Sequence, residues 1–153
     1  MHIQGRYLLG GEHDISECLA IRNEVFGGEQ QFFAAGTEDI DDKNAIFVLA
    51  YEKDEQGTQT PVATGRLIFL ENKNKFKIGR IAVRKEFRGK HYGDFVVRML
   101  IDKAISLGAK EVVVGAQSHA ISFYEKIGFV KQEEEYFEDG IYHLMMSYIP
   151  SDC

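Results

Sequence analysis

Two short stretches of the chain contain residues suited to chemistry. The first, residues 81–93, reads IAVRKEFRGKHYG and places a basic, glycine-containing turn between an apolar strand and a long helix. A helix start presents unpaired N–H groups and the positive end of the helix dipole, and glycines let a phosphate approach the backbone. The turn therefore fits an anion site, and a solvated loop explains it equally well. It contains neither a Walker A sequence nor GxGxxG.

The second stretch, residues 116–129, reads AQSHAISFYEKIGF. On its own it predicts an amphipathic helix that ends at Gly128 and is followed by an apolar residue.

The elements that must position these stretches follow from apolar periodicity. Alternation predicts strands at residues 1–9, 45–52, 61–70, 75–84, 111–116, 129–137 and 141–149. Helical periodicity predicts helices from a capping box at Asp14–Glu17 to the glycines 27 and 28, within 29–36, from 91 to 107, and from 118 to 127. Short polar links at 53–60 and 71–74 predict an antiparallel meander, and the strand–helix–strand unit 78–114 predicts one parallel pair. The expected fold is a mixed α/β sheet with helices on both faces, in one domain over residues 1–153.

Composition narrows the function class. The net charge of −6 argues against nonspecific nucleic-acid binding, which needs a basic surface. No apolar run approaches the roughly 20 residues of a membrane span, and the first ten residues do not resemble a signal peptide. Cys18 and Cys153 lie far apart and form no CxxC, which argues against a disulfide framework or a zinc site. We expect a cytoplasmic protein with no nucleic-acid or membrane partner.

In their order and spacing, the two stretches resemble the GNAT superfamily of N-acetyltransferases. The first is similar to its motif A, Arg/Gln-x-x-Gly-x-Gly/Ala, with Arg88 and Gly93 at the outer positions. The second is similar to its motif B, in which an Ala leads to Phe-Tyr-Glu-Lys-x-Gly-Phe. More loosely, segments 21–26, 38–41 and 140–146 resemble a bacterial subgroup that includes glyphosate N-acetyltransferases. The resemblance implies a sheet splayed between its two parallel strands, and transfer of an acetyl group from acetyl-coenzyme A to a primary amine.

The resemblance also implies how acetyl-coenzyme A binds. The pantetheine pairs with the backbone of the strand before the turn, and the pyrophosphate lies on the turn; the residues are Ile81, Ala82, Val83, Arg88, Gly89, Lys90, His91, Tyr92 and Gly93, with Gln117 and Phe123 beside them. Tyr124 reaches the thioester sulfur, where a phenol with an ordinary pKa of about 10 can protonate the leaving thiolate. Two positions depart from the family pattern. His91 replaces the usual middle Gly of motif A, and Gln117 replaces a frequent Asn.

Arg22 is the most informative residue outside the motifs, because it falls on the apolar stripe of a predicted helix. A buried guanidinium is costly unless it is paired. One interpretation is a structural pair with Glu38 or Asp41. The other is recognition of a carboxylate or phosphonate on the acceptor, which Arg66 and Arg80 on neighbouring predicted strands would join.

His143 alternates with apolar residues on the last predicted strand. A lone His in a strand is more often structural, but in the subgroup a His at the matching place is the general base, and an ordinary pKa near 6.5 suits that role. The acidic run 38–42 lacks the Gly and terminal Glu of a calcium loop, so it predicts a solvated turn, partners for Arg22 or an attraction for a cationic polyamine rather than a metal site.

The sequence thus predicts direct acetyl transfer to a small-molecule primary amine, with acetyl-coenzyme A as co-substrate and no metal. No Cys or Ser lies in a recognisable nucleophile motif, which disfavours a covalent intermediate. Three alternatives stay open: a noncatalytic acyl-coenzyme A sensor, which would not need Tyr124; an enzyme that takes a bulkier acyl group; and an acetyltransferase that modifies proteins. A homodimer is compatible with the sequence.

Overall fold

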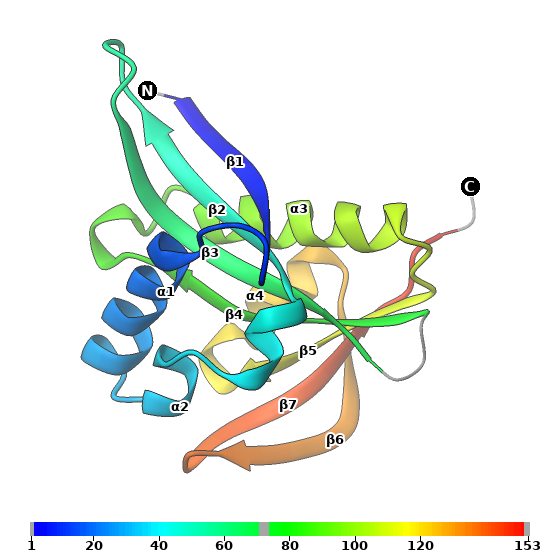
Figure 1. The fold of residues 1–153 in the computed structure, drawn as a ribbon. Helices are drawn as coiled ribbons and strands as arrows, with labels where there is room; N and C mark the ends of the chain where they lie inside the picture. Colours follow the sequence, from blue (N-terminus) through cyan, green and yellow to red (C-terminus); the bar gives the residue numbers. More distant parts are fainter. Residues whose placement is uncertain (1, 71–73, 152–153) are drawn as a thin grey trace.

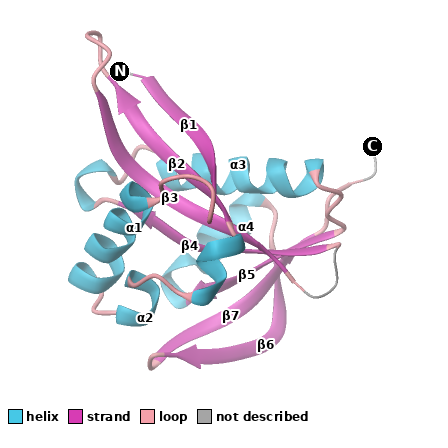
Figure 2. Cartoon of the chain, viewed as in Figure 1, coloured by secondary structure: helices cyan, strands magenta, loops and turns pink. Residues whose placement is uncertain are grey.

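The computed structural model describes residues 2–70 and 74–151, and its elements form a sheet flanked by helices (Figures 1 and 2). Within these ranges the strand order is β1-β2-β3-β4-β5-β7-β6. The strands are β1 (His2–Leu9), β2 (Ile46–Lys53), β3 (Gln59–Phe69), β4 (Lys75–Val83), β5 (Glu111–Gln117), β6 (Val130–Glu138) and β7 (Ile141–Tyr148). The helices are α1 (Ser16–Arg22), η1 (Asn23–Glu29), α2 (Phe33–Gly36), η2 (Ile40–Asn44), η3 (Lys85–Phe87), α3 (Tyr92–Ser106), η4 (Ser118–Ala120) and α4 (Ile121–Ile127).

The predicted pairing of strands is confirmed. Strands β1 to β4 form an antiparallel meander, and β4 pairs with β5 in parallel. Strand β7 then lies between β5 and β6, antiparallel to both. Most of the predicted link at 71–74 lies outside the described residues.

The sheet splays at the parallel pair. Strands β4 and β5 are paired only from Lys75 and Glu111 to Ile78 and Val114, although both strands continue beyond. Just beyond this pairing, β4 places two residues, Arg80 and Ile81, opposite the single Gly65 of β3, and Arg80 has a φ of 53°. Such a bulge bends its strand and increases the twist. As a result, the β6–β7 half of the sheet diverges from the β1–β4 half (Figure 1).

A separate apolar core covers each face of the sheet, which confirms the prediction of helices on both sides (Figure 2). On one face, α3 buries the predicted stripe of Val96, Val97, Leu100, Ile101 and Ala104. On the other face, α1, η1 and α2 bury a smaller cluster that includes Cys18.

The first helical segment differs from its prediction in two ways. No side chain caps the start of α1; instead, the N–H of Ser16 donates to Asp14 Oδ1 at 2.9 Å. The capping box lies later in the chain, between Asp39 and Asp42. The pair Gly27-Gly28 does not end the helix, because the chain continues as the π-helix η1.

Gly36 of α2 packs closely against the backbone of η1 at Gly27. A Cβ on Gly36 of α2 would lie only 2.9 Å from the backbone nitrogen of Gly27, so these two segments approach through their backbones.

The later turns follow the sequence. Gly108, with φ of 90°, ends α3, and the N–H of Ala109 donates to the Ala104 carbonyl at 3.0 Å. Gly128 ends α4 with φ of 123°, and Asp139 and Gly140 form the left-handed turn between β6 and β7. No helix in the described residues is long and apolar enough to cross a membrane.

Candidate active site

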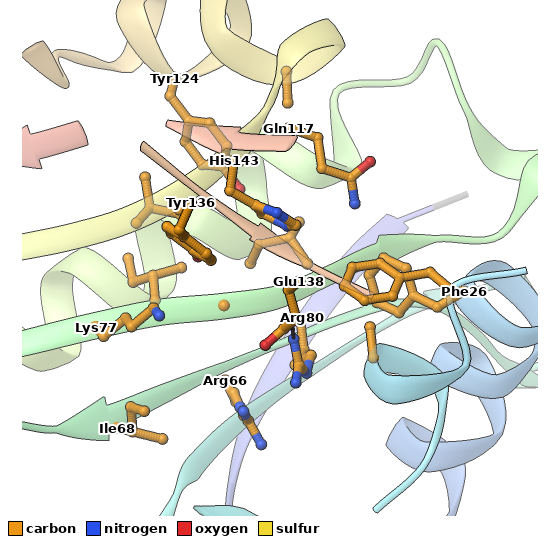
Figure 3. A pocket seen from close by; sticks show the side chains of 18 of the residues that line it. Phe26, Arg66, Ile68, Lys77, Arg80, Gln117, Tyr124, Tyr136, Glu138 and His143 are labelled. Atoms are coloured by element: carbon orange, nitrogen blue, oxygen red, sulfur yellow. Dashed lines mark hydrogen bonds and ion pairs between the residues drawn. The ribbon is translucent and has the colours of Figure 1, made fainter. Parts of the chain in front are cut away.

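A cavity of about 420 Å³ lies where β4 and β5 separate (Figure 3). It is lined from both faces of the sheet: Tyr124 reaches it from α4, and Phe26 and Phe32 reach it from the opposite layer. Because the splay opens a passage between the faces, groups that lie far apart in the sequence line one space. Of the residues predicted for catalysis or binding, the cavity contains Tyr124 and His143 together with Arg66, Arg80, Ile81 and Gln117.

Tyr124 is 6% exposed, and its ring is held edge-on between Phe123 and Phe129, with centroid distances of 5.0 and 5.5 Å. Burial raises the pKa of its hydroxyl above the ordinary value. The phenol is therefore protonated at neutral pH, which is the form that a general acid needs.

His143 is fixed by its neighbours on three strands. It lies opposite Gln117 on β5, and its ring stacks on Tyr136 of β6 with centroids 5.0 Å apart and planes 10° apart. Its Nδ1 is 2.9 Å from the Ile141 carbonyl oxygen. Because a carbonyl only accepts hydrogen bonds, this contact assigns the proton to Nδ1 and leaves Nε2 of the neutral ring with a free lone pair. A lone pair at Nε2 is what a general base requires.

The basic turn before α3 has the geometry of an anion site. Gly89 and His91 both have left-handed backbones, with φ of 83° and 64°, and α3 starts at Tyr92. Glycine adopts this left-handed conformation most easily, which gives a physical reason for the Gly that the family usually has at the position of His91. The first-turn N–H groups of an α-helix have no partner within the helix. Gly93 lies close to its neighbours, since a Cβ there would be 3.5 Å from Phe123 and Val83.

The charged side chains of this turn are engaged within the protein. Arg88 donates to the Val83 carbonyl from Nε at 3.1 Å and Nη2 at 2.9 Å, and its guanidinium also pairs with both carboxylate oxygens of Glu29. Lys90 and Tyr92 instead turn to Glu52 on β2. The backbone amides of the turn therefore remain for an anion, because the side chains of Arg88 and Lys90 are already paired with Glu29 and Glu52.

The remaining predicted cofactor residues lie along the splay. Ile81 lines the cavity, Ala82 is buried at 2% exposure, and Val83 is half-buried at the end of β4. Gln117 ends β5 and donates to Gln30 Oε1 at 3.3 Å.

Arg22 does not reach the cavity, contrary to its predicted role in binding the acceptor. Its side chain is completely buried and donates three hydrogen bonds: from Nη1 to Asp42 at 2.7 Å, from Nε to the Ala35 carbonyl at 3.1 Å and from Nη2 to the Thr37 carbonyl at 2.6 Å. The structural pair considered from the sequence therefore exists, but its partner is Asp42 rather than Glu38 or Asp41. Arg22 ties α1 to the α2–η2 segment.

Arg66 and Arg80 do line the cavity, and they extend the same ionic network (Figure 3). Arg66 donates from Nη1 to Asp39 and Asp42, both at 2.6 Å. Arg80 makes longer bonds to Asp39 at 3.3 Å and to Glu138 at 3.2 Å. Partial burial acts to raise the pKa of Asp39, but the bond to Arg66 and the nearby arginine charges outweigh it and bring the pKa to about 2. Asp39 is thus ionised at neutral pH.

Sequence reasoning missed several cavity residues, namely Phe26, Asp39, Lys77, Tyr136 and Glu138. Phe26 and Asp39 lie in the segments 21–26 and 38–41 that loosely resemble the subgroup, but neither was assigned to the site. Lys77, Tyr136 and Glu138 belong to no motif. In residues 2–70 and 74–151 we find no group of His, Cys, Asp and Glu placed to hold a metal ion.

The chain matches known proteins over most of its length. Residues 16–150 match the family model of the acetyltransferase (GNAT) domain. The N-acetyltransferase YjcF of Bacillus subtilis is 29% identical over 136 residues, which cover 88% of this chain and 92% of that protein.

Solved structures have the same fold. Escherichia coli ElaA superposes with a TM-score of 0.79 at 28% identity, covering 96% of this chain and 99% of ElaA. A Bacillus subtilis acetyltransferase solved in complex with coenzyme A has a TM-score of 0.67 at 21% identity, covering 97% of this chain and all (100%) of its own. The resemblance to the glyphosate N-acetyltransferase subgroup stays a prediction. The splayed sheet, the basic turn before α3 and the family match together show that this chain belongs to the GNAT acetyltransferase family.

Proposed function

We propose that this protein is a single-domain enzyme that transfers an acetyl group from acetyl-coenzyme A to the primary amine of a small molecule. One observation carries the proposal: the splay between β4 and β5 gives Tyr124 and His143, from different layers, access to one cavity. This arrangement puts a proton donor and a proton acceptor on the same reaction space.

The residues present fit acetyl-coenzyme A. The left-handed turn at Gly89 and His91 leads to unpaired helix amides that suit a pyrophosphate. The edge of β4 that faces β5 has no strand partner beyond Ile78, so its backbone is open to a pantetheine. When bound, the co-substrate supplies the activated acetyl group. Its presence in the related Bacillus subtilis structure agrees with this fit.

The chain's own residues would handle the two protons of the reaction. Nε2 of His143 takes a proton from the acceptor ammonium, because only the neutral amine can attack a carbonyl. The Tyr124 hydroxyl gives its proton to the leaving thiolate. Arg80 would contact the acceptor, while Arg66 holds Asp39 in place in the cavity wall.

A thiol-release assay with acetyl-coenzyme A tests the proposal across amino acids, aminophosphonates, polyamines, aminoglycosides and peptides. We expect turnover with a small amine. Coenzyme A binding without turnover on any acceptor would support the sensing module instead, and turnover on peptides alone would support a protein-modifying enzyme.

The pH–rate profile tests the assignment of His143 as the general base. His143→Ala should lower kcat by about 10²–10⁴-fold and remove the acidic limb of the pH–rate profile. His2→Ala, on the outer strand β1, is the matched control and should change neither. An acidic limb that survives in the His143 variant would assign the proton to another group.

Calorimetry tests the anion site. Coenzyme A should bind more tightly than pantetheine, which lacks the pyrophosphate. Equal affinity for both would rule out the turn from Arg88 to Gly93 as the phosphate site.

A further inference from the structure

The ion pairs beside the cavity join equal numbers of positive and negative side chains. Three arginines, Arg22, Arg66 and Arg80, are tied to three carboxylates, those of Asp39, Asp42 and Glu138. Asp41 also lines the cavity but is exposed to solvent.

Lys77 adds a positive charge to this neutral set. It lines the cavity from β4, and its Nζ lies 5.6 Å from the centre of the Tyr136 ring. Within the described part of the chain it forms no ion pair. Glu138 and Asp41 act on it only at longer range, and Glu138 is already paired with Arg80. Desolvation by burial lowers the pKa of the Lys77 ammonium. The charges of Glu138 and Asp41 oppose this shift, and those of Arg80 and Arg66 add to it. A partly buried cation without a direct counter-charge is costly, and a bound anion would offset that cost.

Arg80 is incompletely bonded on the same side of the cavity. Its two side-chain bonds are long, and its buried Nε–H is without an acceptor in the described residues. A buried donor without a partner costs about 1–3 kcal/mol. Arg80 lines the cavity from the left-handed bulge of β4, so the cavity is where an acceptor for Nε–H could bind.

The floor between these two cations is open. Gly79 lies between Lys77 and Arg80 on β4, and a Cβ built on it would meet no atom within 4 Å. The cavity therefore has room for a small group beside Gly79, on the strand that contributes Lys77 and Arg80.

We propose that Lys77 and Arg80 form an anion subsite over Gly79, and that the acceptor is a small amine bearing a carboxylate, of the amino-acid class. The inference rests on the proposed function and specifies its substrate. A simple amine would enter as a cation and meet the ammonium of Lys77, which has no ion pair among the described residues. A carboxylate on the same molecule offsets that repulsion and leaves the amine free to lose its proton.

Pairs of acceptors that differ only in the carboxylate test the inference: serine with ethanolamine, phenylalanine with phenethylamine, and lysine with cadaverine. We expect kcat/KM to favour the acid of each pair by at least about tenfold, the lower bound for a charge-assisted contact. Cadaverine also tests the polyamine alternative raised by Asp39 and Asp41. A preference for cadaverine over lysine would overturn the subsite.

Lys77→Met removes the charge and keeps the length of the side chain. It should abolish the preference by raising KM for the acids, with coenzyme A affinity unchanged. Lys75→Met is the matched control, because Lys75 lies on the same strand but pairs with Glu111 at 3.8 Å. The control should keep the preference, and a loss in both variants would contradict the assignment to Lys77.

A binding measurement separates this inference from the proposed catalysis. Calorimetry on the free protein should show N-acetylserine binding at least tenfold more tightly than N-acetylethanolamine, and Lys77→Met should remove the difference. If no amine is acetylated but this difference is present, the proposed function fails and the anion subsite stands. Equal binding of the two probes by the wild-type protein overturns the subsite whatever the activity.

Discussion

Replacing Arg22 by Met should destabilise the protein without changing how it binds an acceptor. The side chain is completely buried and makes three hydrogen bonds, so its removal leaves the buried Ala35 carbonyl without a donor. Asp42 loses its 2.7 Å bond to Arg22 but keeps Arg66 at 2.6 Å and the Asp39 N–H at 2.8 Å. Breaking a buried ion pair costs about 3–5 kcal/mol, and the remaining partners of Asp42 favour the lower end.

Thermal and urea unfolding measure this effect. In a domain of this size each kcal/mol changes Tm by about 2–4 °C, so we expect Tm to fall by about 6–12 °C. Arg98→Met is the matched control: its pair with Asp94 lies on the exposed surface of α3, and its loss should cost less than about 0.5 kcal/mol.

Kinetics on the folded variant complete the test. Well below its Tm, Arg22→Met should keep the acceptor KM of the wild-type protein. A variant that unfolds within about 1 kcal/mol of wild type and has a tenfold higher acceptor KM would refute the structural role and return Arg22 to the acceptor site.

Three further predictions concern single side chains. Tyr124→Phe should lower kcat by at least about 10²-fold with acetyl-coenzyme A affinity unchanged, whereas Tyr142→Phe, at a half-buried tyrosine of β7 that donates to Glu135, should change neither. A Tyr124 variant within twofold of wild type, with chemistry rate-limiting, rules out the general acid. His91→Gly should stabilise the protein by about 0.5–1 kcal/mol in urea unfolding, because it relieves a left-handed backbone with φ of 64°; unchanged stability would mean that the side chain offsets the strain. Asp39, whose pKa is lowered from 3.8 to about 2, should contribute about 2 kcal/mol of stability above pH 4 that is lost as the pH falls towards 2, and Asp39→Asn should flatten that part of the stability profile.

The elements of the fold were predictable because the signals are local. The apolar stripe of Val96, Leu100 and Ala104 fixes α3, and Gly108 ends it with a backbone that glycine adopts most easily. The start of the chain was harder. The prediction that Gly27-Gly28 end the first helix is wrong, because the chain continues as η1. Gly36 of α2 packs closely against the backbone of η1 at Gly27. Whether a glycine stops a helix or permits close packing depends on a neighbour that the local sequence does not specify.

Some residues of the candidate site could be predicted from the sequence, and others could not. Tyr124 and the turn from Arg88 to Gly93 lie in contiguous motifs, so the sequence by itself was enough to predict the family. The partner of Arg22 and the position of Lys77 were decided only by tertiary structure. Both depend on distances between segments that lie 20 or more residues apart, such as the bond from Arg22 to Asp42. Charge pairing and burial are properties of the packed chain, and no local pattern of residues encodes which cation will be left without a counter-charge.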